Sequence, residues 1–213
     1  MTEAVVFDLD GTLLNTIEDI RDSMNRALSA CGLPTYEADS YCYFVGSGVK
    51  ILAERAVGEN HLELAEKVGK LYQADYDKNA ANLTRPYEGI PELLKALNEK
   101  NIPVTVLSNK PHEATLKVVA HYFPDITFAC VRGQMDGVPV KPDPQGAFEI
   151  VRALNLTPAN CLYAGDTMVD MTCANAAGMR AVGVTWGFRK EEELKRGHAA
   201  YIVHRPQEIL KLI

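Results

Sequence analysis

A short apolar run that ends in two carboxylates, Ala4–Thr12, constrains the fold of this chain more than any other stretch. Its first four residues are all apolar and include two valines, which is typical of a strand buried on both faces. Asp8 and Asp10 follow, and in extended backbone their side chains would point to the same side. Gly11 then allows a tight turn that exposes main-chain N–H groups. Acids at the carboxyl end of a buried parallel strand lie where open α/β sheets bind ligands, although an ordinary acidic turn would show the same residues.

The second half of the chain alternates between strand-like and helix-like segments. Strands are predicted over residues 103–107, 126–131, 161–164, 181–184 and 201–203, and helices over 90–97, up to 122, 145–154, 168–177 and at the end of the chain. This alternation predicts an α/β fold with a doubly wound parallel sheet.

No strand is predicted between Asn15 and Arg85. Helical periodicity instead covers residues 17–31, 36–44, 49–57 and 59–82. A connection of about 70 residues is far longer than an ordinary loop between a strand and a helix. We therefore expect residues 1–15 and 86–213 to form the α/β core domain. Residues 16–85 would form an all-helical cap domain, inserted above the carboxyl end of the first strand.

Composition excludes several classes of protein. A net charge of −6 argues against general binding to nucleic acid or to anionic membranes, which requires basic surface. The five cysteines are scattered and form no Cys-x-x-Cys pair, so neither a disulfide nor a structural zinc site is expected. The first predicted strand leaves no room for a signal peptide, and no apolar run approaches the roughly 20 residues of a membrane helix. These features favour a cytoplasmic protein, either a monomer or a weak dimer.

Polar side chains follow three of the predicted strands. Asp8 and Asp10 follow the first strand, Ser108 the second, and Asp166 and Asp170 the fourth. Because parallel strands end at the same edge of a sheet, these groups should converge. The second acidic pair is spaced by four residues at the start of a predicted helix, which would place both carboxylates on one helical face, although the first acid could instead be an N-cap. Clustered carboxylates suit Mg²⁺, which binds few protein carboxylates together with waters and a phosphate oxygen.

Lys141 is the natural partner for such an acidic cluster. It lies between two prolines in Val-Pro-Val-Lys-Pro-Asp, just ahead of a predicted helix, and could pair with both a carboxylate and a phosphoryl oxygen. Ser108 and the N–H group of Asn109 could bind a further phosphate oxygen, although a hydroxyl at a strand end can also bond only its own backbone.

Four short motifs, in chain order, resemble those of the haloacid dehalogenase superfamily: Asp8-Leu-Asp-Gly-Thr12, then Ser108, then Lys141, then Gly165-Asp-x-x-x-Asp170. The inserted helical segment lies where that superfamily carries its C1-type cap. Within the superfamily, the chain is similar to the phosphoglycolate phosphatases over the segments 44–48, 52–56, 85–89, 108–111 and 185–189. One departure is Ser108, where those phosphatases more often have threonine; the hydroxyl group is kept.

The resemblance implies a Mg²⁺-dependent phosphatase that hydrolyses small phosphorylated metabolites through an aspartyl-phosphate. Asp8 would be the nucleophile and Asp10 the general acid and base. The metal would be held by Asp8, the carbonyl oxygen of Asp10, Asp166 and Asp170. The phosphoryl group would be bound by Gly11, Thr12, Ser108, Asn109 and Lys141.

The cap would select the substrate. Gly46 and Gly48 make a flexible loop able to reach over the site. Lys50, Arg55 and Lys110 are candidates to meet a substrate carboxylate such as that of phosphoglycolate, although each could equally be a solvated charge.

Other functions remain open. Pyrophosphate, a sugar phosphate or a nucleotide would use the same core. A phosphomutase similar to β-phosphoglucomutase would too, although those mutases more often carry Glu-Asp where this chain has Gly165-Asp166. A receiver-like signalling domain is disfavoured because such domains are about half this length and lack the helical insertion.

Overall fold

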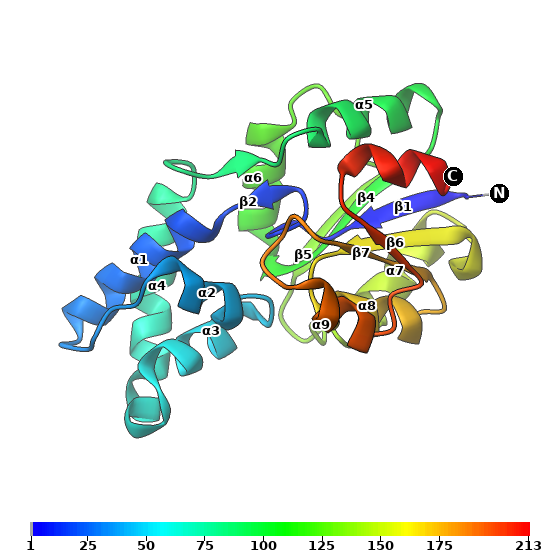
Figure 1. Ribbon diagram of the computed structural model, residues 1–213. Coiled ribbons are helices and arrows are strands. Elements are labelled where there is room, and N and C mark those ends of the chain that lie inside the picture. Colours follow the sequence, from blue (N-terminus) through cyan, green and yellow to red (C-terminus); the bar gives the residue numbers. More distant parts are fainter. Residues whose placement is uncertain (1) are drawn as a thin grey trace.

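The computed structural model describes residues 2–213 and shows a parallel six-stranded sheet between helices, with a group of helices at one end (Figure 1). The strand order is β5-β4-β1-β6-β7-β8, and all neighbouring strands are parallel. The strands are β1 (Ala4–Phe7), β4 (Val104–Pro111), β5 (Cys130–Gln134), β6 (Cys161–Gly165), β7 (Arg180–Val184) and β8 (Tyr201–Val203). The expected α/β fold is confirmed.

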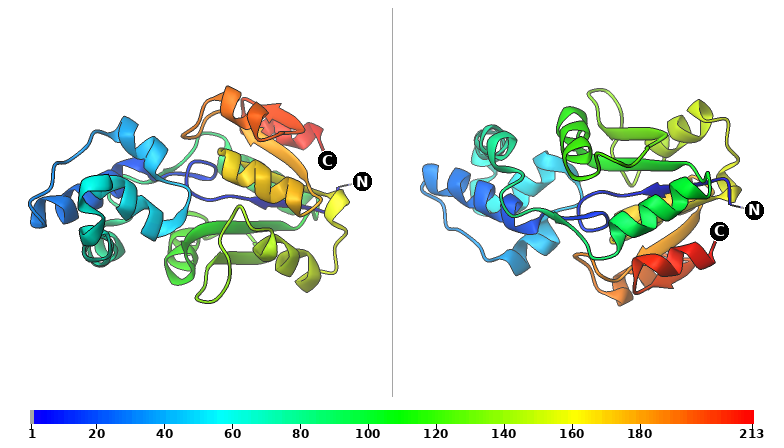
Figure 2. Two further views of the ribbon diagram at one scale, coloured as in Figure 1. Left: turned by 90° about the horizontal axis from the view of Figure 1, so that it is seen from below. Right: turned by 90° about the horizontal axis from the view of Figure 1, so that it is seen from above.

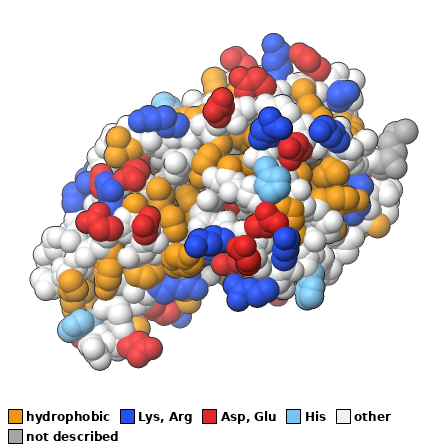
Figure 3. All heavy atoms as spheres, viewed as in Figure 1, with side chains coloured by type: hydrophobic (Ala, Val, Ile, Leu, Met, Phe, Trp, Pro, Cys, Tyr) orange, Lys and Arg blue, Asp and Glu red, His pale blue; other side chains and the backbone are white. Residues whose placement is uncertain are grey.

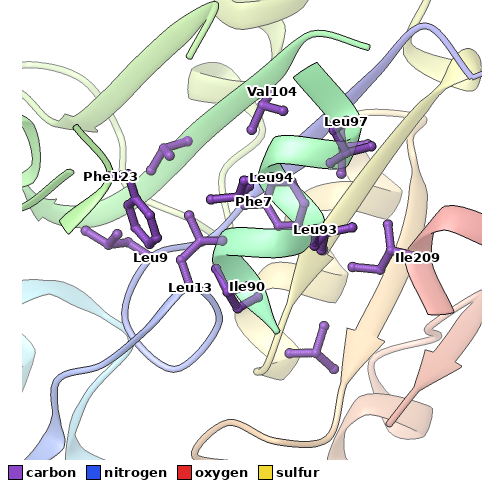
Figure 4. Close-up of a cluster of buried hydrophobic side chains, with 14 of the residues drawn as sticks. Phe7, Leu9, Leu13, Ile90, Leu93, Leu94, Leu97, Val104, Phe123 and Ile209 are labelled. Atoms are coloured by element: carbon purple, nitrogen blue, oxygen red, sulfur yellow. The ribbon is translucent and has the colours of Figure 1, made fainter. Parts of the chain in front are cut away.

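Side chains that alternate along β1 point into two different cores. Val5 and Phe7 face one core, and Ala4 and Val6 face the other. The first core is covered by α5 (Ile90–Glu99), α6 (His112–Tyr122) and the 3₁₀ helix η3 (Pro206–Lys211), and Figure 4 shows α5 leucines packed against Phe7. The second core is covered by α7 (Gln145–Ala153), α8 (Met168–Ala176) and α9 (Glu191–Arg196). Helices therefore cover both faces of the sheet, as Figure 2 shows, which accounts for the apolar run of a central strand such as β1.

The inserted helices have a buried cluster of their own. They are α1 (Ile17–Ala30), α2 (Ala38–Phe44), α3 (Gly48–Val57), the 3₁₀ helix η1 (Glu59–Leu64) and α4 (Ala65–Asn79). Their apolar faces meet around Met24, Leu28, Tyr41 and Val68. In Figures 1 and 2 this cap lies at the end of the molecule away from both chain termini. The division at residues 16 and 85 remains our proposal.

The two crossings between core and cap lie side by side. Short strands β2 (Leu14–Asn15) and β3 (Arg85–Pro86) pair antiparallel. Next to them, the buried carboxylate of Asp19 accepts hydrogen bonds from the backbone N–H groups of Leu83 and Thr84 and from the Thr84 hydroxyl, at 2.8–3.0 Å. This carboxylate ties the start of α1 to the chain segment that returns to the core.

Several predicted elements differ from the observed ones. The strand expected over 126–131 starts at Cys130, because Pro124 and Asp125 lie in a turn and residues 126–128 have no regular structure. The single helix expected over 59–82 is a 3₁₀ segment, a kink at His61 and a shorter α-helix. Helix α9 and the β2–β3 pair were not predicted, because six and two residues are too short to show periodicity.

The surface mixes charges of both signs. In Figure 3, Lys and Arg side chains alternate with Asp and Glu on the face shown. Along residues 2–213, no helix combines the length and the apolar character needed to cross a bilayer.

Candidate active site

Three carboxylates converge at the carboxyl edge of the sheet. Asp8 follows β1, Asp166 follows β6, and Asp170 lies in the first turn of α8. Each offers one oxygen within 4.8 Å of the others, and all three residues are buried. The predicted convergence of strand ends is thus present in the structure.

The route by which Asp166 and Asp170 meet differs from the prediction. Asp166 precedes α8, which begins at Met168, so the two acids do not share a helical face. The N-cap of α8 is Thr167, and Asp170 completes a capping box with it. The Thr167 backbone N–H donates to Asp170 Oδ2 at 3.1 Å, and the backbone N–H of Asp170 donates to Thr167 Oγ1 at 3.3 Å. The Thr167 hydroxyl also donates to Asp170 Oδ2 at 2.7 Å. This reciprocal pair fixes the orientation of the Asp170 carboxylate.

Lys141 joins two of the three acids. Its Nζ donates to Asp8 Oδ1 and Asp170 Oδ1, both at 2.7 Å, and to the Leu107 carbonyl at 3.0 Å. Burial lowers the pKa of Lys141, but the carboxylates of Asp170 and Asp8 outweigh burial and hold that pKa well above its ordinary value. Lys141 is therefore a fixed cation beneath the acidic cluster.

The single positive charge of Lys141 does not balance the negative charges of the three carboxylates. Burial, then the charge of Asp170, raise the pKa of Asp8 to about 7 even though Lys141 lowers it. Burial, then the charges of Asp170 and Asp8, also raise the pKa of Asp166 well above its usual range. A divalent cation would supply the missing positive charge, and buried carboxylate oxygens at this spacing are hard ligands that Mg²⁺ accepts. The residues present therefore fit a Mg²⁺ site.

Asp166 is held from behind by a tightly packed loop. Its Oδ2 accepts a hydrogen bond from the backbone N–H of Phe188 at 2.7 Å, and its Oδ1 accepts one from the Thr12 hydroxyl at 3.4 Å. A methyl group on Gly187 would lie 2.6 Å from Asp166 Cγ, and one on Gly11 would lie 2.7 Å from the same atom. Only glycine leaves room for the carboxylate at these two positions.

Gly11 and Thr12 therefore lie behind Asp166 rather than in the phosphate-binding position predicted for them. The Gly11 N–H donates to the Leu14 carbonyl at 2.8 Å, and the Thr12 hydroxyl is fully buried against Asp166. The Gly11 N–H and the Thr12 hydroxyl therefore both have hydrogen-bond partners within the protein. Their placement instead supports Asp166, one of the acids predicted to bind the metal.

Asn109 connects three segments through its side chain. Its amide oxygen accepts from the Lys141 N–H at 2.8 Å, and its Nδ2 donates to the carbonyls of Lys141 and Gly46, both at 2.9 Å. The side chain thus clamps the lysine loop and also contacts the cap. The sequence predicts a role only for the backbone N–H of this residue, and the side-chain contacts come from the fold.

Asp10 faces a different lysine. Its two carboxylate oxygens each accept a hydrogen bond from Lys110 Nζ at 3.1 Å. Ser108 lies nearby at the end of β4, and its Oγ accepts from the Lys110 N–H at 3.2 Å. Strand β4 runs to Pro111, so Ser108, Asn109 and Lys110 belong to its end and do not follow it as expected.

A cleft lies between these residues and the cap. Asp8, Asp10, Ser108, Asn109, Lys110 and Lys141 form its core side. The cap side is largely apolar and comprises Ile20, Val45, Gly46, Gly48, Val49, Leu52, Tyr72, Gln73 and Tyr76. Gly46 and Gly48 therefore line the cleft, as expected for a loop over the site.

The other two cap candidates do not reach the cleft. The Lys50 side chain is 86% exposed and pairs with Glu54 at 4.0 Å. Arg55 Nη1 donates to the carbonyls of Tyr43 and Phe44 at 3.1 and 2.9 Å. Among the residues described, Lys110 and Lys141 are the two basic side chains that line the cleft.

Two cleft-lining residues, Tyr72 and Tyr76, are not among the site residues predicted from the sequence. Both are buried in the cap cluster, and their rings stack at 5.3 Å, yet they also form the wall that faces Asp10. Their spacing of four residues on α4 indicates a shared face, but only the docking of the cap shows that this face meets the core.

Comparison with known proteins agrees with this geometry. A family model described as "Haloacid dehalogenase-like hydrolase" matches residues 5–184. A phosphoglycolate phosphatase of Aquifex aeolicus is 28% identical over 98% of this chain and 95% of its own length. One from Mesorhizobium japonicum is 30% identical over 94% of this chain and 90% of its own. A crystal structure of a candidate phosphoglycolate phosphatase from Lactobacillus delbrueckii superposes with a TM-score of 0.93, at 28% identity, covering 100% of this chain and 99% of that one.

Proposed function

Because the chain belongs to the haloacid dehalogenase-like hydrolases and is a phosphatase resembling the phosphoglycolate phosphatases, we propose that it is a Mg²⁺-dependent phosphatase of small phosphorylated metabolites. The observation that carries the proposal is the convergence of Asp8, Asp166 and Asp170 within 4.8 Å, with Lys141 bonded to two of them. Such a cluster can hold a metal and a phosphoryl group at one point.

Asp8 is the nucleophile in this mechanism. Its carboxylate attacks phosphorus and forms an aspartyl-phosphate while the bond to the leaving oxygen breaks. Lys141, Ser108 and the Asn109 N–H bind the phosphoryl oxygens. Asp10 protonates the leaving alkoxide and then accepts a proton from the water that hydrolyses the aspartyl-phosphate.

The metal would be held by the carboxylates of Asp8 and Asp166 and by the Asp10 carbonyl, with Asp170 bound directly or through water. When bound, Mg²⁺ supplies positive charge that offsets the negative charge of the phosphoryl oxygens. The Phe188 and Thr12 hydrogen bonds hold the Asp166 carboxylate ready for this role.

Phosphoglycolate is the first substrate to test, because it is the substrate named for the relatives. We propose cytoplasmic action on a free metabolite by a monomer or weak dimer. The net charge of −6 supports a small ligand over nucleic acid or an anionic membrane.

The test is phosphate release from phosphoglycolate, pyrophosphate, sugar phosphates and nucleotides, each with Mg²⁺ and with chelator. Metal-dependent release with one preferred ester supports the proposal and names the substrate. Release that chelator leaves unchanged would remove the metal from the mechanism. Failure with every ester, together with phosphate transfer between two hydroxyls of a sugar, would favour the phosphomutase.

A further inference from the structure

Lys110 is buried where core and cap meet, and its ammonium group faces Asp10. Its Nζ donates to both carboxylate oxygens of Asp10 at 3.1 Å and to the Tyr76 hydroxyl at 3.0 Å. An ammonium group has three N–H donors, so these three contacts use its full capacity. The side chain is therefore held in one orientation by one carboxylate and one phenol.

Tyr76 brings this contact from the cap. It lies on α4, is 2% exposed, and stacks on Tyr72 with ring centroids 5.3 Å apart. Its ring centroid is 4.5 Å from Lys110 Nζ, within the range of a cation–π interaction. The cap thus contacts the lysine through both the hydroxyl and the ring of one buried tyrosine.

The three side chains come from three separate segments. Asp10 follows β1, Lys110 lies near the end of β4, just before Pro111, and Tyr76 belongs to the inserted helix α4. Two further contacts dock the cap beside them: Asn109 Nδ2 bonds the Gly46 carbonyl at 2.9 Å, and Arg189 Nη2 bonds the Val45 carbonyl at 3.1 Å. The series of hydrogen bonds that links Tyr76 to Asp10 through Lys110 is complete only with the cap in this position.

A general acid must lie within hydrogen-bond reach of the oxygen that it protonates. The carboxylate of Asp10 turns about two side-chain bonds and needs a partner to fix it. We propose that Lys110 is a positioning residue that orients the Asp10 carboxylate, and that Tyr76 fixes Lys110, so that docking of the cap completes the acid–base group. The inference rests on the role of Asp10 in the proposed function.

The test separates steps that need Asp10 from one that does not. Protonation by Asp10 matters for an alkoxide leaving group but not for p-nitrophenolate, which leaves as a stable anion. With Mg²⁺ present, we would measure kcat and KM on phosphoglycolate, or on the alkyl phosphate that the substrate panel selects, and the pre-steady-state burst of p-nitrophenolate from p-nitrophenyl phosphate. The variants are Lys110→Met, Tyr76→Phe and Asp10→Asn.

We expect Lys110→Met to lower kcat on the alkyl phosphate by about 10- to 100-fold, since small misplacements of a catalytic group have effects of this order. KM and the p-nitrophenolate burst rate should change by less than about threefold, while turnover after the burst slows, because water attack also needs Asp10. Tyr76→Phe, which removes one hydroxyl, should show the same pattern with a loss of about 2- to 5-fold. Tyr122→Phe removes a buried hydroxyl outside the cleft and should leave every rate unchanged.

A double-mutant cycle completes the test. If Lys110 acts through Asp10, Lys110→Met has no further effect on kcat in an Asp10→Asn background. A multiplicative loss in that background would overturn the inference. The inference would also be overturned if Lys110→Met slowed the p-nitrophenolate burst as much as it slows alkyl phosphate turnover. An effect of Lys110→Met confined to KM for carboxylated substrates would overturn it too. Wild-type protein that releases no phosphate from any ester would instead refute the proposed function, and the inference with it.

Discussion

Gly187→Ala should disable the proposed metal site although residue 187 contributes no ligand. The φ angle of Gly187 lies outside the left-handed region, so the backbone accepts alanine and only the available space decides the outcome. The new methyl group would overlap Asp166 Cβ and the Gly11 carbonyl oxygen and would lie 2.6 Å from Asp166 Cγ. Ordinary contact begins near 3.4 Å, so Asp166 or the Gly11 loop must move by at least about 0.8 Å, the difference between 3.4 and 2.6.

Such a shift stretches the 2.7 Å hydrogen bond from the Phe188 N–H and moves one ligand of the proposed metal. A misplacement near 1 Å can lower a rate by about 10²-fold, so kcat/KM should fall by about this factor. Loss of a supporting contact typically weakens metal affinity about 10- to 100-fold. At a Mg²⁺ concentration of 100 Kd, metal binding stabilises the wild-type fold by about 2.7 kcal/mol, and a tenfold weaker site would provide about 1.4 kcal/mol.

The assay is phosphate release under saturating Mg²⁺, together with thermal unfolding with and without Mg²⁺. Gly69→Ala is the matched control, because its new methyl group would meet Ala53 Cβ at 3.5 Å and Val49 Cγ1 at 3.9 Å, both ordinary contacts. That variant should keep its activity and gain up to about 1 kcal/mol from helix propensity. The reasoning is refuted if Gly187→Ala keeps kcat/KM within threefold of wild type and responds to Mg²⁺ as wild type does.

Three further outcomes are expected. Asp8→Asn should abolish turnover while circular dichroism and the melting transition show a folded protein; wild-type rates would remove Asp8 as nucleophile. In chelator, thermal stability should fall as pH rises from about 4 to about 7. Burial raises the pKa of Asp8 in the folded protein to about 7, so over this range the folded state keeps a proton that the unfolded state releases. A melting temperature that rises over the same range would contradict this reasoning. Asp19→Ala should lower the free energy of unfolding by about 2–5 kcal/mol, because the buried N–H and hydroxyl groups of Thr84 lose their acceptor, as does the part-buried Leu83 N–H. Urea denaturation measures this loss, and a value under about 1 kcal/mol would mean that water replaces the carboxylate.

The sequence predicts the core well because each sheet strand buried on both faces shows a short apolar run. The span of β1 was predicted to the residue, and the central strands β6 and β7 to within one. Edge strand β5 was misplaced because residues 130–132 are only partly buried, which weakens the apolar signal.

The acidic cluster was predictable because parallel strands end at one edge. The details depend on contacts between distant segments. The clamp of Asn109 on Lys141 spans 32 residues, and the Lys110–Asp10 contact spans 100. No local pattern encodes such pairs. Gly11 and Thr12 show the same limit, because their bonding to Leu14 and Asp166 follows from the folded loop and not from the motif.

The paired strands β2 and β3 also bear on how such a protein can diversify. Since Leu14–Asn15 lies beside Arg85–Pro86, the chain leaves and re-enters the core about one strand spacing apart, near 5 Å. Residues 16–84, between these two strands, therefore form a loop whose ends are held together at the sheet. Doubling the length of such a loop adds only about 0.6 kcal/mol of closure entropy. Residues 16–84 can therefore lengthen, shorten or change sequence without altering strand order. The two aspartate pairs, Ser108 and Lys141 all lie outside this loop, so these groups can be inherited unchanged while the walls of the cleft evolve around the contact of Tyr76 with Lys110.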